Sequence, residues 1–246
     1  MKVGCVPYIN ALPLIWPAVR GDADWPVEVI YDVPAALPAM LDSGEVDAVL
    51  VSSIEVLCKP GMRAVEGIGI CSFGPVASVR LISSLPLPQI RSFRPDAHSM
   101  TSNALAKALL TRVAGTPPTN GDDARVLIGD LGLQSSEQAY DLGECWTDDT
   151  GFPFVWALWV GREGLTGELA TCLHEGCRRG LADLENVKQE AHRRGPFDRA
   201  TLDHYFDTNI HFQIGPEEMQ GLNEFRTWTE CLFEPEWVSP KVEIAP

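Results

Sequence analysis

The chain has 246 residues, of which 45% are hydrophobic and 22% are charged, a balance typical of a globular protein with a substantial core. Asp and Glu outnumber Lys and Arg by 34 to 19, which gives a formal net charge of −15 at pH 7. Because neutralising phosphate groups needs clustered Lys and Arg, this acidity argues against nucleic acid or an anionic membrane as a partner.

The cysteines, the histidines and the first residues predict neither a disulfide scaffold, nor a metal site, nor an export signal. The seven cysteines form no C-x-x-C pair and the five histidines show no paired ligand spacing, so we expect no metal and a reducing, cytoplasmic location. Gly4, Pro7 and Pro13 interrupt the apolar start of the chain, and no window approaches the length of a membrane span.

The first fifty residues predict the order β-loop-β-α-β. Apolar runs predict strands over 3–6, 27–31 and 46–51, and residues 34–42 predict a helix with Pro at its start. The run VDAVLV at 46–51 is typical of a strand buried on both faces, as in a parallel sheet.

The middle of the chain continues the alternation of strands and helices. Further strands are predicted over 67–71, 78–83, 125–128 and 154–160. Between them we expect a proline-rich connector at 84–95, an amphipathic helix at 101–113 and a turn-rich loop at 115–124. Thr101 or Ser102 is the expected N-cap of that helix.

This alternation predicts an α/β fold with mainly parallel sheets. The C-terminal third is helical over 168–206, with one break at 195–196, and again over 216–232. The proline-rich connector and the returning strand at 154–160 predict two lobes. We place residues 1–82 and 156–246 in the first lobe, with both termini, and residues 83–155 in the inserted second lobe.

Ligands of open α/β sheets lie beyond the carboxyl ends of strands, so the residues after the predicted strands are the candidate site. These segments are rich in small hydroxyl residues and Gly, with one amide: 7–10, 52–55, 72–75, 98–102 and 129–130. Such groups bind carboxylates or phosphates at helix N-termini, which predicts a small anionic ligand. Considered alone, Thr101 or Ser102 fits a helix cap as well as it fits a ligand-binding residue.

Other catalytic constellations in the sequence are weak. It has no G-x-S-x-G, no P-loop and no G-x-G-x-x-G. Four of the five histidines fall in the helical C-terminal third, whereas His98 lies in a predicted loop at a strand–helix junction.

Six segments in the first two thirds of the chain resemble, in order and spacing, the chorismate dehydratase family of menaquinone biosynthesis by the futalosine pathway. They are VGCVPYINALPL (3–14), SGEVDAVLVSSIE (43–55), SFGPVASVRL (72–81), TSNALAKALL (101–110), LIGDLGL (127–133) and YDLGECWTDDTGFPFVWALWV (140–160). A sister family, 1,4-dihydroxy-6-naphthoate synthase, resembles these segments less.

The resemblance implies a fold like that of the type II periplasmic binding proteins, with two α/β lobes that close on a ligand cleft. It also implies a carbon–oxygen lyase that removes water from chorismate to give 3-[(1-carboxyvinyl)oxy]benzoate, with no cofactor. The family often has Arg directly before the Thr–Ser helix start, and here that residue is Met100. One contact to a substrate carboxylate is then missing or is supplied from elsewhere, with Arg80 as a candidate.

Asn10 is the candidate catalytic residue under this interpretation. Its amide does not titrate, so it cannot be an ordinary base, but it can orient the substrate and assist the departing hydroxyl. The base would be a substrate carboxylate or a water. The expected substrate-binding residues are Tyr8, Ser53, Ser78, Thr101, Ser102 and Asp130. Asp130 fits an acceptor for a substrate hydroxyl, a proton-transfer group or a helix cap, and Glu55 is expected to be structural.

Two other functions stay open at this point. The naphthoate synthase would need a larger cleft and a different ligand, and a non-catalytic protein that binds small anions would share the cleft architecture. The absence of a signal peptide or lipid anchor argues against the second. We expect a monomer or a homodimer.

Overall fold

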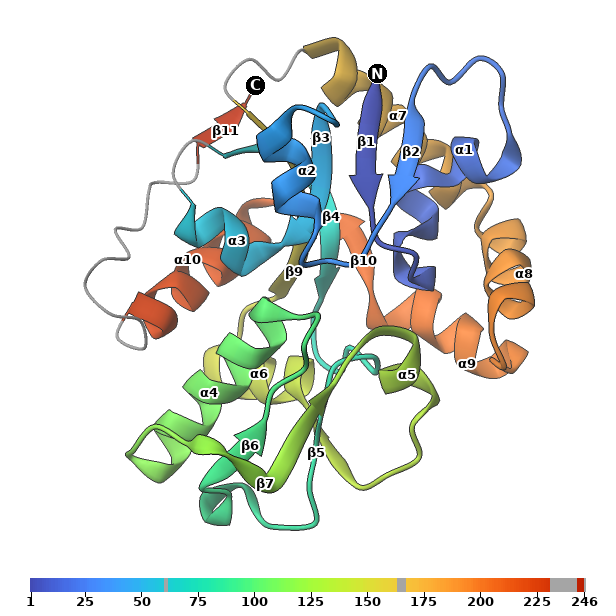
Figure 1. The fold of residues 1–246 in the computed structure, drawn as a ribbon. Coiled ribbons are helices and arrows are strands. Elements are labelled where there is room, and N and C mark those ends of the chain that lie inside the picture. Colours follow the sequence, from blue (N-terminus) through green and yellow to red (C-terminus); the bar gives the residue numbers. More distant parts are fainter. Residues whose placement is uncertain (60–61, 163–166, 231–242, 246) are drawn as a thin grey trace.

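The computed structural model describes residues 1–59, 62–162, 167–230 and 243–245, and these form two lobes, each built on its own sheet (Figure 1). The first sheet has the strand order β10-β4-β9-β3-β1-β2, and β11 also pairs with β4. Its strands are β1 (Lys2–Cys5), β2 (Glu28–Tyr31), β3 (Ala48–Ser52), β4 (Arg63–Ser72), β9 (Phe154–Gly161), β10 (His211–Gln213) and β11 (Glu243–Ala245).

The second sheet has the order β6-β7-β5-β8. Its strands are β5 (Arg80–Ile82), β6 (Ser92–Arg94), β7 (Thr119–Leu127) and β8 (Ala139–Asp141). The helical elements of this lobe are η2 (Leu87–Gln89), α4 (Met100–Ala114), α5 (Gly129–Gln134) and α6 (Leu142–Thr150).

The remaining helical elements belong to the first lobe (Figure 1). They are η1 (Ile9–Ile15), α1 (Trp16–Arg20), α2 (Leu37–Ser43), α3 (Ser53–Cys58), α7 (Gly167–Ala182), α8 (Leu184–Arg194), α9 (Arg199–His204), η3 (Tyr205–Asn209) and α10 (Pro216–Glu230). Among the described residues no helix combines the length and the apolar character needed to cross a bilayer.

The two-lobed α/β fold is as expected, but the prediction of mainly parallel sheets is wrong. Of the nine strand pairings between described residues, five are antiparallel. Two of the five involve β9, which returns from the second lobe, enters between β3 and β4 and runs against both. Two more involve β5, which runs against β7 and β8. An apolar run such as the one in β9 does not reveal the direction in which its neighbours will run.

The turn-rich loop predicted at 115–124 is also wrong, because residues from Thr119 onward form the first half of β7. This polar stretch becomes a strand through its partner β6, with Thr119 opposite Ser92 and Asn120 opposite Phe93. The proline-rich connector likewise contains η2 and β6. Tertiary pairing here overrides local composition.

The helical C-terminal third is confirmed but more divided than expected. Residues 168–206 hold α7, α8, α9 and the start of η3, with a first break at Asp183. The last predicted helix ends at Glu230, and its final two predicted residues lie outside the described part. The chain passes from the first sheet to the second over residues 73–79 and returns over residues 142–153. The lobe bounds given above remain a prediction.

An aromatic cluster packs the two lobes together. Trp146 of α6 is fully buried, and its ring lies 5.1 Å from that of Phe154 and 4.7 Å from that of Trp228. Phe225, also on α10, completes the cluster. Edge-to-face aromatic pairs contribute about 0.5–1.5 kcal/mol each beyond their buried area. Trp146 therefore anchors the second lobe and does not line a cleft.

Helix α7 holds the segment that carries Asn10. A methyl group on Gly180 would lie 2.1 Å from the carbonyl oxygen of Pro13, and one on Gly176 would lie 3.0 Å from that of Leu14. Only glycine permits this approach, so α7 lies directly on the backbone of η1.

We predict that Gly180→Ala destabilises the protein by about 1–3 kcal/mol, because α7 must move off η1. Thermal unfolding would show a drop of roughly 2–4 °C for each kcal/mol. The matched control is Gly167→Ala, at the start of the same helix, where a methyl group meets no atom within 4 Å. Equal melting temperatures for the two variants would contradict this close contact.

Candidate ligand-binding cleft

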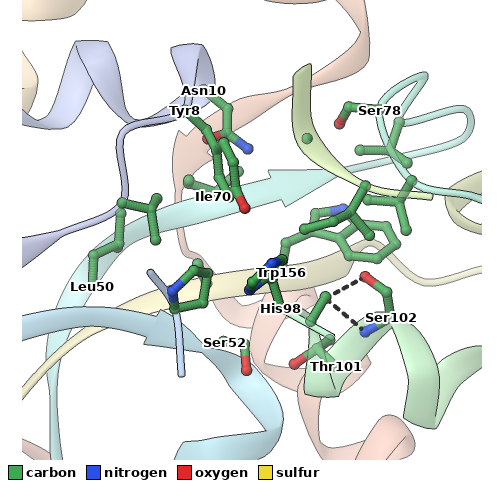
Figure 2. Close-up of a pocket in the computed structure, with 18 of the residues that line it drawn as sticks. Tyr8, Asn10, Leu50, Ser52, Ile70, Ser78, His98, Thr101, Ser102 and Trp156 are labelled. Carbon is green, nitrogen blue, oxygen red and sulfur yellow. Dashed lines mark hydrogen bonds between the residues drawn. The ribbon is translucent and has the colours of Figure 1, made fainter. Parts of the chain in front are cut away.

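A cavity of about 680 Å³, part of it open to solvent, lies between the lobes beyond the carboxyl ends of β1 and β3. Five of the seven predicted site residues line it: Tyr8, Asn10, Ser78, Thr101 and Ser102. Figure 2 shows Tyr8 and Asn10 on one side of the cavity, with Thr101 and Ser102 on the other.

Ser53 and Asp130 do not line the cavity; the residues directly before them, Ser52 and Gly129, do. Ser53 is fully buried, with its Oγ 3.4 Å from Thr101 Oγ1. Asp130 is half-buried, and its Oδ1 accepts a hydrogen bond of 3.2 Å from the backbone N–H of Ile9. Ser53 therefore contacts a lining residue, and Asp130 contacts the residue between Tyr8 and Asn10, which both line the cavity.

Asp130 and Thr101 connect the lobes at helix starts. Asp130, on α5, accepts from the first residue of η1. Thr101, on α4, accepts at 3.0 Å through its Oγ1 from the N–H of Ile54, the second residue of α3. Each side chain from the second lobe thus satisfies a free N–H group at a helix start in the first lobe.

The N-cap of α4 is Ser99, so the prediction of Thr101 or Ser102 is wrong. Ser99 has an extended backbone, and its Oγ accepts from the Ser102 N–H at 3.3 Å. The Ser99 hydroxyl also donates to Ser102 Oγ at 2.7 Å, and the dashed lines in Figure 2 mark both contacts. Because Ser99 fills the cap and donates to Ser102, the proton of the Ser102 hydroxyl is left for the cavity.

Asn10 carries an unpaired polar atom. Its Oδ1 is buried and has no hydrogen-bond partner among the described residues. A buried acceptor without a partner costs about 1–3 kcal/mol, so such an atom is an expected contact for a ligand or a water.

The cavity lining carries no full charge. None of the described residues that line it is Lys, Arg, Asp or Glu, and His98 is the single imidazole among them. The positive end of the 15-residue helix α4, which has no acidic residue in its first turn, points at the cavity. An anion in this cleft would therefore be held by N–H and O–H donors.

Met100 and Arg80 have no place in this lining. Met100 is the first residue of α4 and is 46% exposed. Arg80 donates to the backbone carbonyls of Ser135 and Glu137, so the structure contradicts its suggested role as a substitute cation. Glu55 is structural, as expected. Its carboxylate pairs with the Lys59 ammonium at 2.9 Å.

The buried phenol of Tyr205 was missed by the sequence reasoning. It lines the cavity and donates through Oη to Ser78 Oγ at 2.9 Å. Burial raises the pKa of Tyr205 well above its usual range. Trp156, another missed lining residue, donates through Nε1 to Ser72 Oγ at 2.9 Å. Nothing in the helical pattern around residue 205 distinguishes this tyrosine.

Burial also raises the pKa of Tyr8, with the Asp96 and Asp130 carboxylates adding to the effect. The ring of Tyr8 lies against Gly129, whose φ is +60° and where a methyl group would sit 3.3 Å from the ring.

Among the described residues no group of three or more His, Cys, Asp or Glu side chains is arranged as a metal site.

Asp130 makes a testable contribution to stability. Burial raises its pKa above the usual value, although the Ile9 N–H partly opposes this. A carboxyl with a raised pKa stabilises the fold when protonated, and this contribution is lost as the pH rises through its folded-state pKa. We predict that Asp130→Asn, which keeps an acceptor for Ile9, is more stable than the wild type at pH 7.

The gain should disappear as the pH falls towards the usual Asp pKa of about 4. Urea unfolding of both proteins from pH 4 to pH 8 measures this difference. Asp148→Asn, at an exposed position on α6, is the control. A stability gain that is the same at every pH would argue against a buried, ionisable Asp130.

Comparison with known proteins identifies relatives that match most of the chain. It is 28% identical over 240 residues to the chorismate dehydratase of Thermus thermophilus, an alignment that covers 84% of this chain and 88% of that protein. It is 29% identical over 237 residues to the chorismate dehydratase of Campylobacter jejuni, with 92% and 96% covered.

Solved structures agree on the fold. A protein from Archaeoglobus fulgidus superposes with a TM-score of 0.73 at 14% identity, covering 94% of this chain and 97% of that one. The periplasmic aliphatic sulphonate binding protein SsuA from Escherichia coli gives 0.69 at 13% identity, covering 100% and 92%. The fold is therefore that of the periplasmic binding proteins. The profile of the family described as menaquinone biosynthesis matches residues 1–230, and the chain belongs to this family.

Proposed function

We propose that this protein is a chorismate dehydratase, an enzyme that eliminates water from chorismate to give 3-[(1-carboxyvinyl)oxy]benzoate. The observation that carries the proposal is the buried, unpaired Oδ1 of Asn10 in a cleft whose other polar groups are mainly hydroxyls and amides. The family and the two relatives named above support the same reaction.

The cleft suits a small ring that carries carboxylates. Chorismate has two carboxylates, a ring hydroxyl and an enolpyruvyl ether. Ser78 and Ser102, which lie on different chain segments, offer hydroxyls, and the start of α4 adds a favourable field. Apolar residues such as Ile70, Val76 and Trp156 make up much of the remaining lining and would hold the ring.

The reaction breaks the C3–H and C4–O bonds of the substrate. The C3 proton is vinylogous to the ring carboxylate, so charge that develops there spreads into that group. The C3–H electron pair becomes the new C3–C4 double bond, the hydroxyl leaves C4, and the proton and hydroxyl together make one water. The ring becomes aromatic, which provides the thermodynamic drive.

Asn10 would act on the departing hydroxyl. Its Oδ1 can accept a hydrogen bond from the hydroxyl, and its Nδ2 can donate one to the oxygen as the C4–O bond breaks. Because α7 packs on η1, the amide is held in one place before the substrate arrives. A substrate carboxylate or a water would take the C3 proton, and His98 is the rival base among the described lining residues.

The cellular setting belongs to the same proposal. The six cysteines in the described part are free thiols, which fits the cytoplasmic location expected from the sequence. The monomer or homodimer stays a prediction.

We predict that the purified protein converts chorismate to a product lighter by one water, and that Asn10→Ala lowers kcat by roughly 100-fold or more, as losses of charge-stabilising donors do in other enzymes. Ultraviolet spectra and product mass measure both. Asn120→Ala, at an exposed position on β7, is the matched control.

Three other outcomes would count against parts of this proposal. Wild-type turnover in Asn10→Ala would remove Asn10 from the mechanism. Binding of chorismate without turnover would favour the non-catalytic binding protein. If chorismate neither binds nor reacts, the naphthoate synthase becomes the leading candidate.

A further inference from the structure

The segment that presents Ser78 has an unusual backbone. Ala77 has a φ of +62°, and it is the one non-glycine residue in the described part with a positive φ. The Ser78 N–H donates to the Val76 carbonyl at 2.7 Å, two residues back, which makes a very tight turn. Such strained turns persist only where the surroundings hold them, and they concentrate at functional sites.

One side of this turn is held by the Asp141 carboxylate. Its two oxygens accept from the N–H of Val76 at 3.0 Å and of Ala77 at 2.7 Å. The same carboxylate caps α6 by accepting from the N–H of Gly143 at 2.9 Å and of Glu144 at 3.1 Å. The turn is thereby attached to a helix of the second lobe.

The other side is held by η3, a single turn of π-helix in the first lobe. Asn209 donates through Nδ2 to the Pro75 carbonyl at 2.8 Å, and Tyr205 donates through Oη to Ser78 Oγ at 2.9 Å. Tyr205 is 1% exposed and Asn209 is 4% exposed. Single π-turns are rare and are frequent at functional sites.

We propose that Tyr205 is a positioning residue that turns the Ser78 hydroxyl into a donor aimed at a carboxylate in the cleft. A serine hydroxyl has one proton and two acceptor sites. When Tyr205 donates to one acceptor site, the Ser78 proton remains for the ligand. The identity of the ligand in this inference rests on the proposed function. The hydrogen bond from Tyr205 to Ser78 does not depend on that function.

The surroundings of Tyr205 keep it a donor. Burial holds the pKa of the phenol well above its usual range, so the hydroxyl keeps its proton at neutral pH. The Asn10 side chain also lies close enough to this hydroxyl to act on its pKa. The Tyr205 phenol therefore contacts Ser78 and lies beside the candidate catalytic amide of Asn10. Ser78 and Asn10 come from different chain segments.

The test is a double-mutant cycle on substrate affinity. Tyr205→Phe keeps the ring, which packs against Phe206 with centroids 5.4 Å apart, and removes only the hydroxyl. We expect it to raise KM for chorismate roughly three- to tenfold, as expected for one lost hydrogen bond, with kcat changed by less than about twofold. In a Ser78→Ala background the same change should have no further effect, because Tyr205 acts through Ser78.

Tyr140→Phe is the matched control, because Tyr140 donates to the Leu85 carbonyl at 2.9 Å and does not line the cleft. An unchanged KM in Tyr205→Phe would overturn the inference. So would an equal loss with and without Ser78, which would mean that Tyr205 acts by packing or directly on the ligand.

Benzoate binding, measured by calorimetry, separates this inference from the proposed function. If the wild type does not turn over chorismate, the proposed function fails. Weaker benzoate binding in Tyr205→Phe, with no change in Tyr140→Phe, would still support the positioning role. A wild type that does not bind benzoate, or equal affinities in the wild type and Tyr205→Phe, would overturn it.

Discussion

The arrangement of the cleft depends on the insertion of β9 between β3 and β4. β9 enters the first sheet beside the strand from which the chain leaves it, with Phe154 opposite Ser72. The second lobe is therefore attached to the first through two neighbouring strands, which bring both crossings to one place. The same insertion sets Ala157 opposite Ser52 at the end of β3, and both residues line the cavity. The sheet that connects the lobes is thus also the floor of the site.

Two of the contacts between the lobes are made at helix starts, and no ion pair between described residues crosses the cleft. Thr101 and Asp130, both from the second lobe, satisfy backbone N–H groups at the starts of α3 and η1. This arrangement leaves the lining without full charges while the whole chain carries a net charge of −15. A neutral, donor-rich cleft avoids burying cations that would need partners when no anion is bound. Under the proposed function, affinity for an anion depends on the orientation of each donor, and the turn that presents Ser78 is held from both lobes.

Much of the fold and of the cleft was predictable from local pattern. The apolar run of β3 and the amphipathic α4 are where periodicity places them, and the segment after β1 carries Tyr8 and Asn10 into the cavity. The failures have physical causes. The polar sequence of β7 becomes a strand because β6 pairs with it, and Ser99 replaces the expected cap because its backbone is extended. Arg80 was a candidate cation under the family resemblance, yet it donates to two backbone carbonyls in the segment between α5 and β8.

The sequence by itself determined the alternation of strands and helices, the hydroxyl- and amide-rich loops at strand ends, and the family resemblance, because each depends on residues close together in the chain. Tertiary structure alone decided the direction of β9, the capping of α3 by Thr101 and the contact of Tyr205 with Ser78. That last pair is separated by 127 positions. A hydrogen bond between such distant side chains requires both to be fixed by packing in different elements, and no local pattern of apolar and polar residues carries that information.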